Sequence, residues 1–251
     1  MKAVTLMAAA AIVFVSPGCK AQDGNAGGGN TALNVEPVKP PPGGDWAQVV
    51  SQTPAGGFVM GNPNARVKLI EFGSMTCPHC REFDEAGVQP LIDKYVKTGH
   101  VSFEFRNFVR DPFDLAASLI ARCNGASGFF PLTRALFKDQ PTWIAKLQGL
   151  PPQQFESLQA LGPEQQFREV AQLAGFQDWA TVRGLPAAKS NACLGNQAEI
   201  DRLVQMTSNA TTEFPDMKGT PTFVINGKLH NDIGTWKALE ERLRAAMGER
   251  G

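Results

Sequence analysis

The chain has 251 residues, of which 43% are hydrophobic, and its 24 Lys and Arg are balanced by 24 Asp and Glu. This length accommodates one domain with a sizeable insertion, and the apolar content is sufficient to form a core. The balanced charge argues against binding to nucleic acid, or to an anionic membrane, through a basic field. Five cysteines suggest two pairs and one cysteine with a separate role.

Residues 1–18 have the pattern of an export signal. An uncharged stretch at 3–15 has the length of a signal-peptide apolar region and is too short for a relaxed membrane span. Glycine then stands directly before Cys19, which resembles the bacterial lipoprotein motif and predicts lipidation of Cys19. The sequence departs from that motif at Ser16, where leucine is usual. An ordinary signal cleaved near Ala21 is the alternative.

Residues 19–44 are rich in glycine and proline and have no apolar period, so they cannot bury enough surface to offset the entropy of folding. We predict that they form a flexible tether that holds a domain away from a membrane surface. Periodic patterns begin at Asp45. They predict a first sheet-containing part at 45–111, a helical insertion at 112–215 and a second sheet-containing part at 216–251.

The first sheet-containing part has three predicted strands or strand-like segments. A short helix or arm is expected at 46–52 and a short edge strand at 58–60. A strand at 67–72 is apolar on both faces near its end, and alternation of residue types predicts another strand at 101–108.

A helix is predicted between the last two of these strands. It should begin near Cys77, with Thr76 or Ser74 as its cap, and continue to Gly99. Pro90 should kink or break it, because proline lacks the N–H that an interior helical position needs.

The pattern changes at 112–215, where about 100 residues have helical periodicity without a convincing strand. Strands return at 222–225 and 228–230, joined by Asn226-Gly227, a strong signal for a two-residue hairpin turn. A last amphipathic helix should begin near Thr235. The order predicts an α/β fold: a small mixed sheet flanked by helices and interrupted by one insertion.

The sequence Cys77-Pro78-His79-Cys80 stands directly after a predicted strand, and Pro78 suits a first helical turn. Two cysteines at this spacing can close a small disulfide ring. The helix N-terminus favours a thiolate, and His79 can add positive charge, so the disulfide would be a strong oxidant. A zinc site would need a second pair of ligands. A c-type haem site would need a histidine at position 81, where this chain has arginine. We predict a redox-active dithiol without metal or cofactor.

Together with Glu71-Phe72 at a strand end and Gly219-Thr220-Pro221-Thr222-Phe223 before the hairpin, this motif resembles the DsbA-like branch of the thioredoxin superfamily. Its members are bacterial periplasmic thiol-disulfide oxidoreductases. The resemblance covers about residues 58–248. It implies a thioredoxin fold, with a central mixed sheet flanked by helices and an inserted all-helical domain.

The resemblance also implies roles for single residues. Cys77 would be the exposed nucleophile that forms a mixed disulfide with substrate, and Cys80 the buried partner that resolves it. Pro221 would be a cis-proline facing the disulfide, and the backbone of Thr220 would pair with the substrate peptide. Glu71 would be a buried acid that accepts or returns the proton of Cys80. A glutamate bonded to solvent or to a nearby lysine is the alternative.

Cys123 and Cys193 fall in the predicted helical insertion. Such cysteines are expected to pair in an oxidising compartment, and some members of the family carry a second bridge in this domain. It would close a loop of about 70 residues, worth about 4 kcal/mol in the chain-entropy model. Two separate buried thiols are the alternative. With both pairs assigned, Cys19 remains, as expected for a lipidated residue.

The leading functional hypothesis is an exported, periplasmic protein disulfide oxidase. It would pass the Cys77–Cys80 disulfide to reduced envelope proteins and be reoxidised by a membrane redox partner. The alternative is an isomerase or reductase of misoxidised proteins that a different membrane partner keeps reduced. Thr220 supports it, because threonine often precedes the cis-proline in the superfamily's isomerases, where the oxidase has valine.

Two further points concern assembly and turnover. Isomerases of the superfamily usually carry an N-terminal dimerisation module, and residues 20–57 are too short and too rich in glycine and proline to form one. The sequence therefore favours a monomeric oxidase. A hypothesis from another class is an envelope chaperone that binds clients beside Pro221 without turnover.

Overall fold

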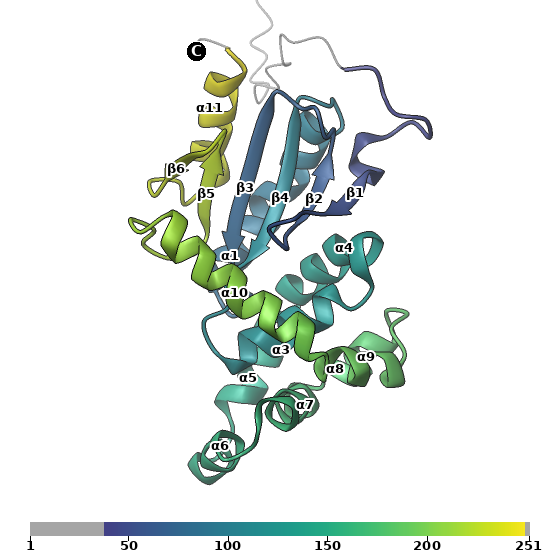
Figure 1. Cartoon of the computed structure of the whole chain (residues 1–251), viewed down its shortest axis with the longest axis vertical. Coiled ribbons are helices and arrows are strands. Elements are labelled where there is room, and N and C mark those ends of the chain that lie inside the picture. The colour runs from purple at the N-terminus through teal and green to yellow at the C-terminus, as the bar shows by residue number, and fades with distance from the viewer. Residues whose placement is uncertain (1–37, 249–251) are drawn as a thin grey trace, which may run out of the picture. The chain divides into compact units, whose positions relative to one another are not determined.

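The computed structural model describes residues 38–248, so the predicted signal at 1–18, Cys19 and most of the predicted tether lie outside the described residues. Six strands form one sheet in the order β1-β2-β4-β3-β5-β6 (Figure 1). Their bounds are β1 Val50–Gln52, β2 Phe58–Gly61, β3 Val67–Gly73, β4 Val101–Asn107, β5 Thr222–Ile225 and β6 Lys228–His230.

The centre of the sheet is the parallel pair β3 and β4, aligned from Val67 opposite Val101 to Gly73 opposite Asn107. β5 pairs antiparallel with the other side of β3. β3 and β4 are buried along most of their length, as expected for strands covered on both faces. Because β3 and β4 end at the same edge and β5 begins there, three connecting segments meet at that edge.

The segment between β3 and β4 stays helical from residue 78 to residue 96. It consists of α1 (Pro78–Phe83), the π-helical η2 (Asp84–Val88), α2 (Gln89–Leu91) and the π-helical η3 (Ile92–Val96). Of the predicted kink or break at Pro90, the break is therefore wrong, because the helix continues through this residue. The wider π turns on either side relax the helical hydrogen-bond pattern around a residue that cannot donate.

The predicted caps of this helix are also wrong. Cys77 is the N-cap residue, in an extended conformation with φ −83° and ψ 119°. The hydroxyls of Ser74 and Thr76 instead bond to side chains that follow β4.

The N-terminal strands differ from the sequence expectation in one respect. Residues 46–52 form a short 3-10 helix, η1 (Trp46–Gln48), followed by β1. β1 pairs with the outer side of β2, so β2 is an inner strand and β1 is the edge. Before them, the last part of the predicted tether lies against the domain, because the N–H of Val38 donates to the carbonyl of Thr98 at 2.9 Å.

Eight α-helices lie between β4 and β5, and another follows β6. Their bounds are α3 Pro112–Arg122, α4 Gly125–Lys138, α5 Gln140–Gln148, α6 Pro152–Gln159, α7 Pro163–Ala174, α8 Phe176–Thr181, α9 Ala187–Leu194, α10 Gln197–Glu213 and α11 Trp236–Met247. The Asn226-Gly227 turn is confirmed, with positive φ angles of 49° and 81° that suit a type I′ hairpin.

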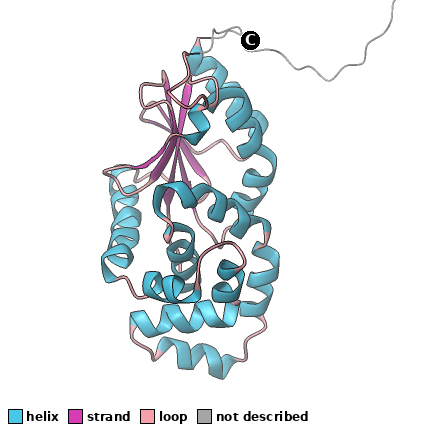
Figure 2. Ribbon diagram, turned by 90° about the vertical axis from the view of Figure 1, so that its right-hand side faces the viewer, coloured by secondary structure: helices cyan, strands magenta, loops and turns pink. Residues whose placement is uncertain are grey.

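Helices cover both faces of the sheet (Figure 2). On one face, Phe72 and Val224 pack with Ala210 of α10, and Phe214 adds an edge-on ring contact to Phe72. On the other face, Phe223 packs against Phe83 of α1, with ring centroids 4.7 Å apart. Side chains alternate along a strand, so Glu71 faces the α1 side while its neighbour Phe72 faces α10.

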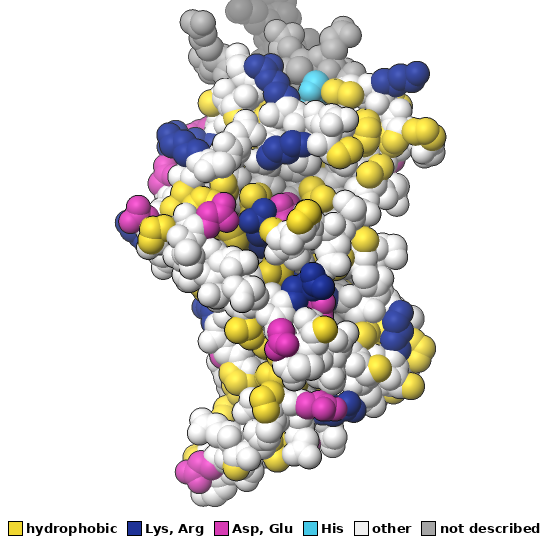
Figure 3. Space-filling model, viewed as in Figure 1, with side chains coloured by type: hydrophobic (Ala, Val, Ile, Leu, Met, Phe, Trp, Pro, Cys, Tyr) yellow, Lys and Arg dark blue, Asp and Glu magenta, His cyan; other side chains and the backbone are white. Residues whose placement is uncertain are grey.

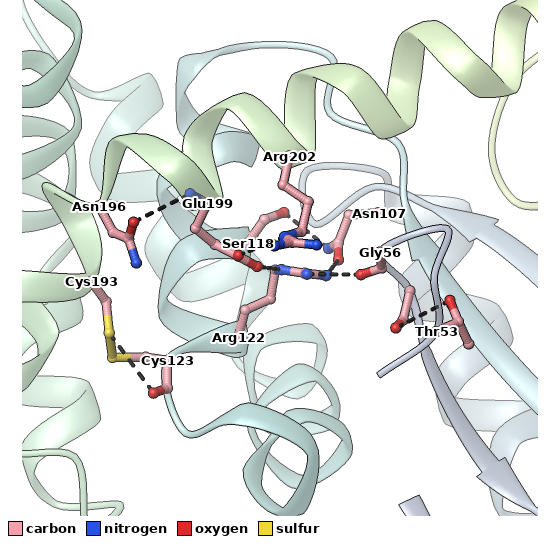
Figure 4. A network of polar contacts seen from close by, with 11 residues as sticks. Thr53, Gly56, Asn107, Ser118, Arg122, Cys123, Cys193, Asn196, Glu199 and Arg202 are labelled. Carbon is pink, nitrogen blue, oxygen red and sulfur yellow. Dashed lines mark hydrogen bonds and ion pairs between the residues drawn. A yellow bond between two sulfur atoms is a disulfide. The ribbon is translucent and has the colours of Figure 1, made fainter. Parts of the chain in front are cut away.

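A buried arginine connects the helical segment to the sheet (Figure 4). Arg122 of α3 bonds through its guanidinium to Glu199 of α10 at 2.5 Å, to Asn107 of β4 at 3.0 Å and to the carbonyl of Gly56 at 2.8 Å. Its charge also lies 4.7 Å from the ring centroid of Phe58. One side chain thus joins two helices, a central strand and the β1–β2 loop.

A disulfide lies beside this network. The structure joins Cys123, directly after α3, to Cys193 of α9, with Cα atoms 5.6 Å apart. The two residues are 70 positions apart in sequence, so the bond ties distant helices together.

On the surface shown in Figure 3, acidic and basic side chains are interspersed and do not gather by sign. None of the helices within residues 38–248 combines the length and apolar character that a bilayer crossing requires. The same residues hold no cluster of three or more His, Cys, Asp or Glu that could bind a metal ion.

Arg122 and Arg202 both bond to Glu199, so substitutions at the two positions can be compared. The comparison tests whether the buried Arg122 attaches the helical segment to the sheet. Replacing the buried Arg122 with leucine leaves the Gly56 carbonyl unpaired and should lower the free energy of unfolding by about 3 kcal/mol. The Arg202→Leu control removes a half-exposed partner and should cost under about 1 kcal/mol. Urea unfolding measures both, and equal losses would contradict this assignment.

Candidate functional site

The site lies where β3 ends and α1 begins (Figure 1). The Cys77 sulfur is 3.1 Å from the carbonyl oxygen of Thr220, in the loop before β5. The Thr220–Pro221 peptide bond is cis. The pairing of β5 with β3 therefore brings two sequence segments about 140 positions apart into contact.

The two cysteines of the motif are free thiols, and both are buried. Cys77 is 2% exposed and Cys80 is fully buried, so the expectation of an exposed Cys77 is wrong. The Thr220 loop covers one side of Cys77, and the buried Gln140 of α5 donates to its backbone carbonyl at 3.0 Å. Gln140 also donates to the carbonyl of Met75 at 2.7 Å, which fixes the segment before the motif.

The surroundings of Cys77 favour its thiolate. They lower its pKa to about 5, and a hydrogen bond from the Cys80 thiol is the largest cause. Burial opposes this shift, while Thr220, the backbone amide of Cys80 and the positive charge of Arg110 add to it. The hydroxyl of Thr220 is buried and has no hydrogen-bond partner among the described residues, so it can donate to the Cys77 thiolate. A thiolate at the start of a helix is the reactive form for disulfide exchange.

Cys80 has the opposite character. Burial raises its pKa well above the usual thiol range, and the nearby Cys77 and Glu71 contribute in the same direction. The two sulfurs therefore have different roles, because the thiolate forms on Cys77 while Cys80 keeps its proton.

Glu71 is buried on the same side of the sheet, with 2% of its surface exposed. Burial is the largest cause of its strongly raised pKa, followed by the charges of Asp84 and Cys77. The alternative of a glutamate bonded to solvent or to Lys68 is wrong, because Glu71 is buried and the Lys68 ammonium bonds to the carbonyl of Pro63. A carboxyl group with a raised pKa beside a buried thiol can supply or accept a proton.

His79 points away from this cluster. Its side chain is 73% exposed, and Nδ1 lies 3.0 Å from a carboxylate oxygen of Glu82. Glu82 is the main cause of its raised pKa, and the charge of Cys77 contributes less. Arg110 is the cation among the leading causes that lower the pKa of Cys77. His79 is not among those causes.

The sequence did not reveal three residues around the motif: Arg110, Asp114 and Gln140. Arg110 and Asp114 follow β4. Because parallel strands end at the same edge of a sheet, the sequence could have placed these two residues near the motif that follows β3. Gln140 had no such signal, because it reaches the motif from a helix whose packing only the tertiary structure defines.

The remaining predicted residues lie elsewhere. The Cys123–Cys193 disulfide belongs to the helical segment, where it joins α9 to the residue that follows α3. Cys19 lies outside the described residues.

Comparisons with known proteins identify the family of the chain and its fold. The thioredoxin family model matches residues 53–245. The chain is 33% identical to a solved protein-disulfide isomerase from Novosphingobium aromaticivorans, with a TM-score of 0.73, covering 76% of this chain and 97% of that one. The solved α-DsbA1 of Wolbachia pipientis is 21% identical, with a TM-score of 0.62 over 79% of this chain and 94% of that one, and shows the fold.

Among curated proteins, a candidate protein-disulfide oxidoreductase from Rickettsia felis is 27% identical over 76% of this chain. The match covers 63% of that relative, and 57% of a similar protein from Rickettsia bellii, so the chain spans less than two thirds of their length. The family match covers most of the folded residues, including the dithiol and the cis-proline. The chain therefore belongs to the thioredoxin family, and its structure has the DsbA-like form of the thioredoxin fold.

Proposed function

We propose that the protein is a dithiol oxidase that donates a Cys77–Cys80 disulfide to substrate proteins. The observation that carries this proposal is the environment of the Cys77 sulfur, which lies at a helix start and has a pKa lowered to about 5. Stabilising this thiolate stabilises the reduced protein relative to its disulfide. The disulfide then gives up its bond readily, which makes it an oxidant.

The exchange has two steps. A substrate thiolate attacks the Cys77 sulfur of the disulfide, the Cys77–Cys80 bond breaks, and Cys80 leaves as a thiolate. Because burial raises the pKa of Cys80, that sulfur takes up a proton, and the protonated Glu71 can supply it. A second substrate thiolate then attacks the mixed disulfide and releases the Cys77 thiolate. The substrate dithiol loses two electrons, and the protein gains them.

The substrate chain would bind at the loop before β5. The cis peptide bond before Pro221 and the contact between Cys77 and Thr220 place backbone groups beside the reacting sulfur. A peptide could pair with this backbone as an added strand. This arrangement suits reduced envelope proteins of many sequences, because main-chain hydrogen bonds do not depend on side chains.

The isomerase direction has support of its own. The 33% identical structure is named a protein-disulfide isomerase, and threonine precedes the cis-proline here. An isomerase works from the reduced form and acts on misoxidised proteins. The low pKa of Cys77 favours that form as well, so the reduction potential decides between the two directions.

The location and organisation also belong to this proposal. The export signal at 1–18, lipid on Cys19 and a tether at 19–44 would place a monomeric domain in the periplasm, where a membrane partner reoxidises it. The helical insertion at 112–215 would divide the thioredoxin parts at 45–111 and 216–251. The Cys123–Cys193 disulfide supports an oxidising compartment.

The roles of the two cysteines can be separated by trapping. A reduced Cys80→Ser variant should accumulate a mixed disulfide between Cys77 and a client protein that carries a disulfide. The Cys77 thiolate attacks that bond and releases one client thiolate, and the Cys80 thiol that would release the second is missing. A Cys77→Ser variant should form no such adduct. Non-reducing electrophoresis with mass spectrometry identifies the linked residue. Equal adducts in both variants would contradict the assignment, and client binding by Cys77→Ser without any loss of client oxidation would favour a chaperone.

The thiolate predicts a pH dependence of the reduced protein. Thiolate absorbance at 240 nm should titrate with a midpoint near pH 5 and be absent in Cys77→Ser. Because the folded pKa lies below the usual thiol value of 9.0, this group adds stability that is complete above pH 9 and is lost as the pH falls towards 5. A titration midpoint near 9 would contradict the proposed environment.

Equilibration with glutathione measures the reduction potential of the pair. An oxidase should have a value near the oxidising end of the family range, about −120 mV. A value of about −270 mV would instead support a reductase or isomerase that receives electrons from a partner.

The proton role of Glu71 is tested by Glu71→Gln. The variant removes the ionisable group, so the step that releases or re-forms the Cys80 thiolate should slow by about 10- to 100-fold. The Glu85→Gln control alters a half-exposed carboxylate that pairs with Arg81 and should leave both steps unchanged. Stopped-flow fluorescence measures the rates, and equal effects in the two variants would exclude a specific proton role for Glu71.

A further inference from the structure

A polar network surrounds Arg110, in the segment between β4 and α3. Its guanidinium donates to the hydroxyl of Ser74 at 2.8 Å and to that of Thr76 at 2.9 Å. Ser74 and Thr76 lie in the segment between β3 and α1, three positions and one position before Cys77. The guanidinium is thus bonded to the residue directly before the reactive cysteine.

The hydroxyls that hold Arg110 are themselves held. Ser74 is fully buried and donates to Asp114 at 2.6 Å, and Thr76 donates to Asp111 at 3.1 Å. Asp114 also accepts the backbone N–H of Met75 at 2.8 Å and that of Arg110 at 3.1 Å. Each partner is therefore fixed from a second side, and the network joins the segments that follow two parallel strands.

The charges in this network are arranged unevenly. The guanidinium bonds to hydroxyl groups and not to a carboxylate, so no direct ion pair cancels its charge through these contacts. The two acids act one bond further away, and burial raises the pKa of Asp114 to about 7, which reduces its negative charge near neutral pH. His79, which lies within the motif, is instead paired with Glu82 at the surface.

We propose that Arg110 is a further residue of the thiol–disulfide site, which Ser74 and Thr76 hold so that its positive charge stabilises the thiolate of Cys77. This inference rests on the proposed exchange function and adds a residue to it. Arg110 acts through Cys77 and is a positioning residue. By stabilising the thiolate, it makes the reduced protein more stable and the disulfide more oxidising. It also favours Cys77 as the leaving sulfur when the mixed disulfide is resolved.

The test compares Arg110→Gln with the wild type in a thiolate titration of the reduced protein and in a redox equilibrium with glutathione. The midpoint of the 240 nm thiolate titration should rise, because a positive charge that favours the thiolate is lost. The equilibrium constant with glutathione should shift by about three- to tenfold towards a less oxidising disulfide. A tenfold shift corresponds to about 30 mV for this two-electron couple. Arg110→Lys keeps the charge and should recover most of both effects.

Two controls separate this role from general stability. Arg168→Gln removes an exposed arginine that bonds to Glu164 on α7 and should leave both measurements unchanged. Thr76→Val keeps the charge of Arg110 but removes one of its anchors, so it should give a smaller shift in the same direction. Circular dichroism and urea unfolding show whether each variant is folded.

The possible outcomes are distinct. An unchanged thiolate midpoint in a folded Arg110→Gln variant would overturn the inference, as would an equal shift in Arg168→Gln. If wild-type Cys77 does not exchange with glutathione at all, the proposed function fails instead. The absorbance titration requires no exchange, so it still reports whether Arg110 stabilises the thiolate.

Discussion

The pairing of β3 with β4 on one side and with β5 on the other is the constraint on which the site depends. Because β3 and β4 run parallel and β5 runs antiparallel to them, two strands end and one begins at the same edge of the sheet. The segments at that edge carry the dithiol, the Arg110 network and the cis-proline. Arg110 and the cis-proline are both distant in sequence from the dithiol and from each other.

This edge creates an unequal pair of sulfurs. Cys77 caps a helix and is in contact with Thr220, and several donors and a cation favour its thiolate. Cys80 lies one helical turn deeper, where burial and the neighbouring Glu71 disfavour charge. A difference of this kind is what disulfide exchange needs, because one sulfur must react and leave as an anion while the other stores a proton. The different reactivity of the two sulfurs thus follows from their different surroundings, one helical turn apart.

The helical segment contributes to the site as well as covering the sheet. Gln140 of α5 bonds to two backbone carbonyls around the motif, and Asp114 of α3 holds the loop before it. Arg122 anchors α3 and α10 to β4 and the β1–β2 loop (Figure 4). The insertion is therefore joined to the thioredoxin elements through buried polar contacts. A change in its packing would be transmitted to the segment that precedes Cys77.

The sequence by itself determined the features that depend on neighbouring residues. The motif at a helix start, the Asn226-Gly227 hairpin, the last helix and the long helical stretch all follow from local periodicity and turn chemistry. The family resemblance added the fold. Local signals did not predict that the helix continues through Pro90, because wider π-helical turns on either side accommodate the proline.

Only the tertiary structure decided the exposure and charge environment of each site residue. It buried Cys77, turned His79 towards Glu82 and brought Arg110 to the motif from the end of another strand. The physical reason is that a pKa depends on burial and on charges nearby in space. Strand pairing and helix packing set both of these across long sequence separations, where no local pattern records them.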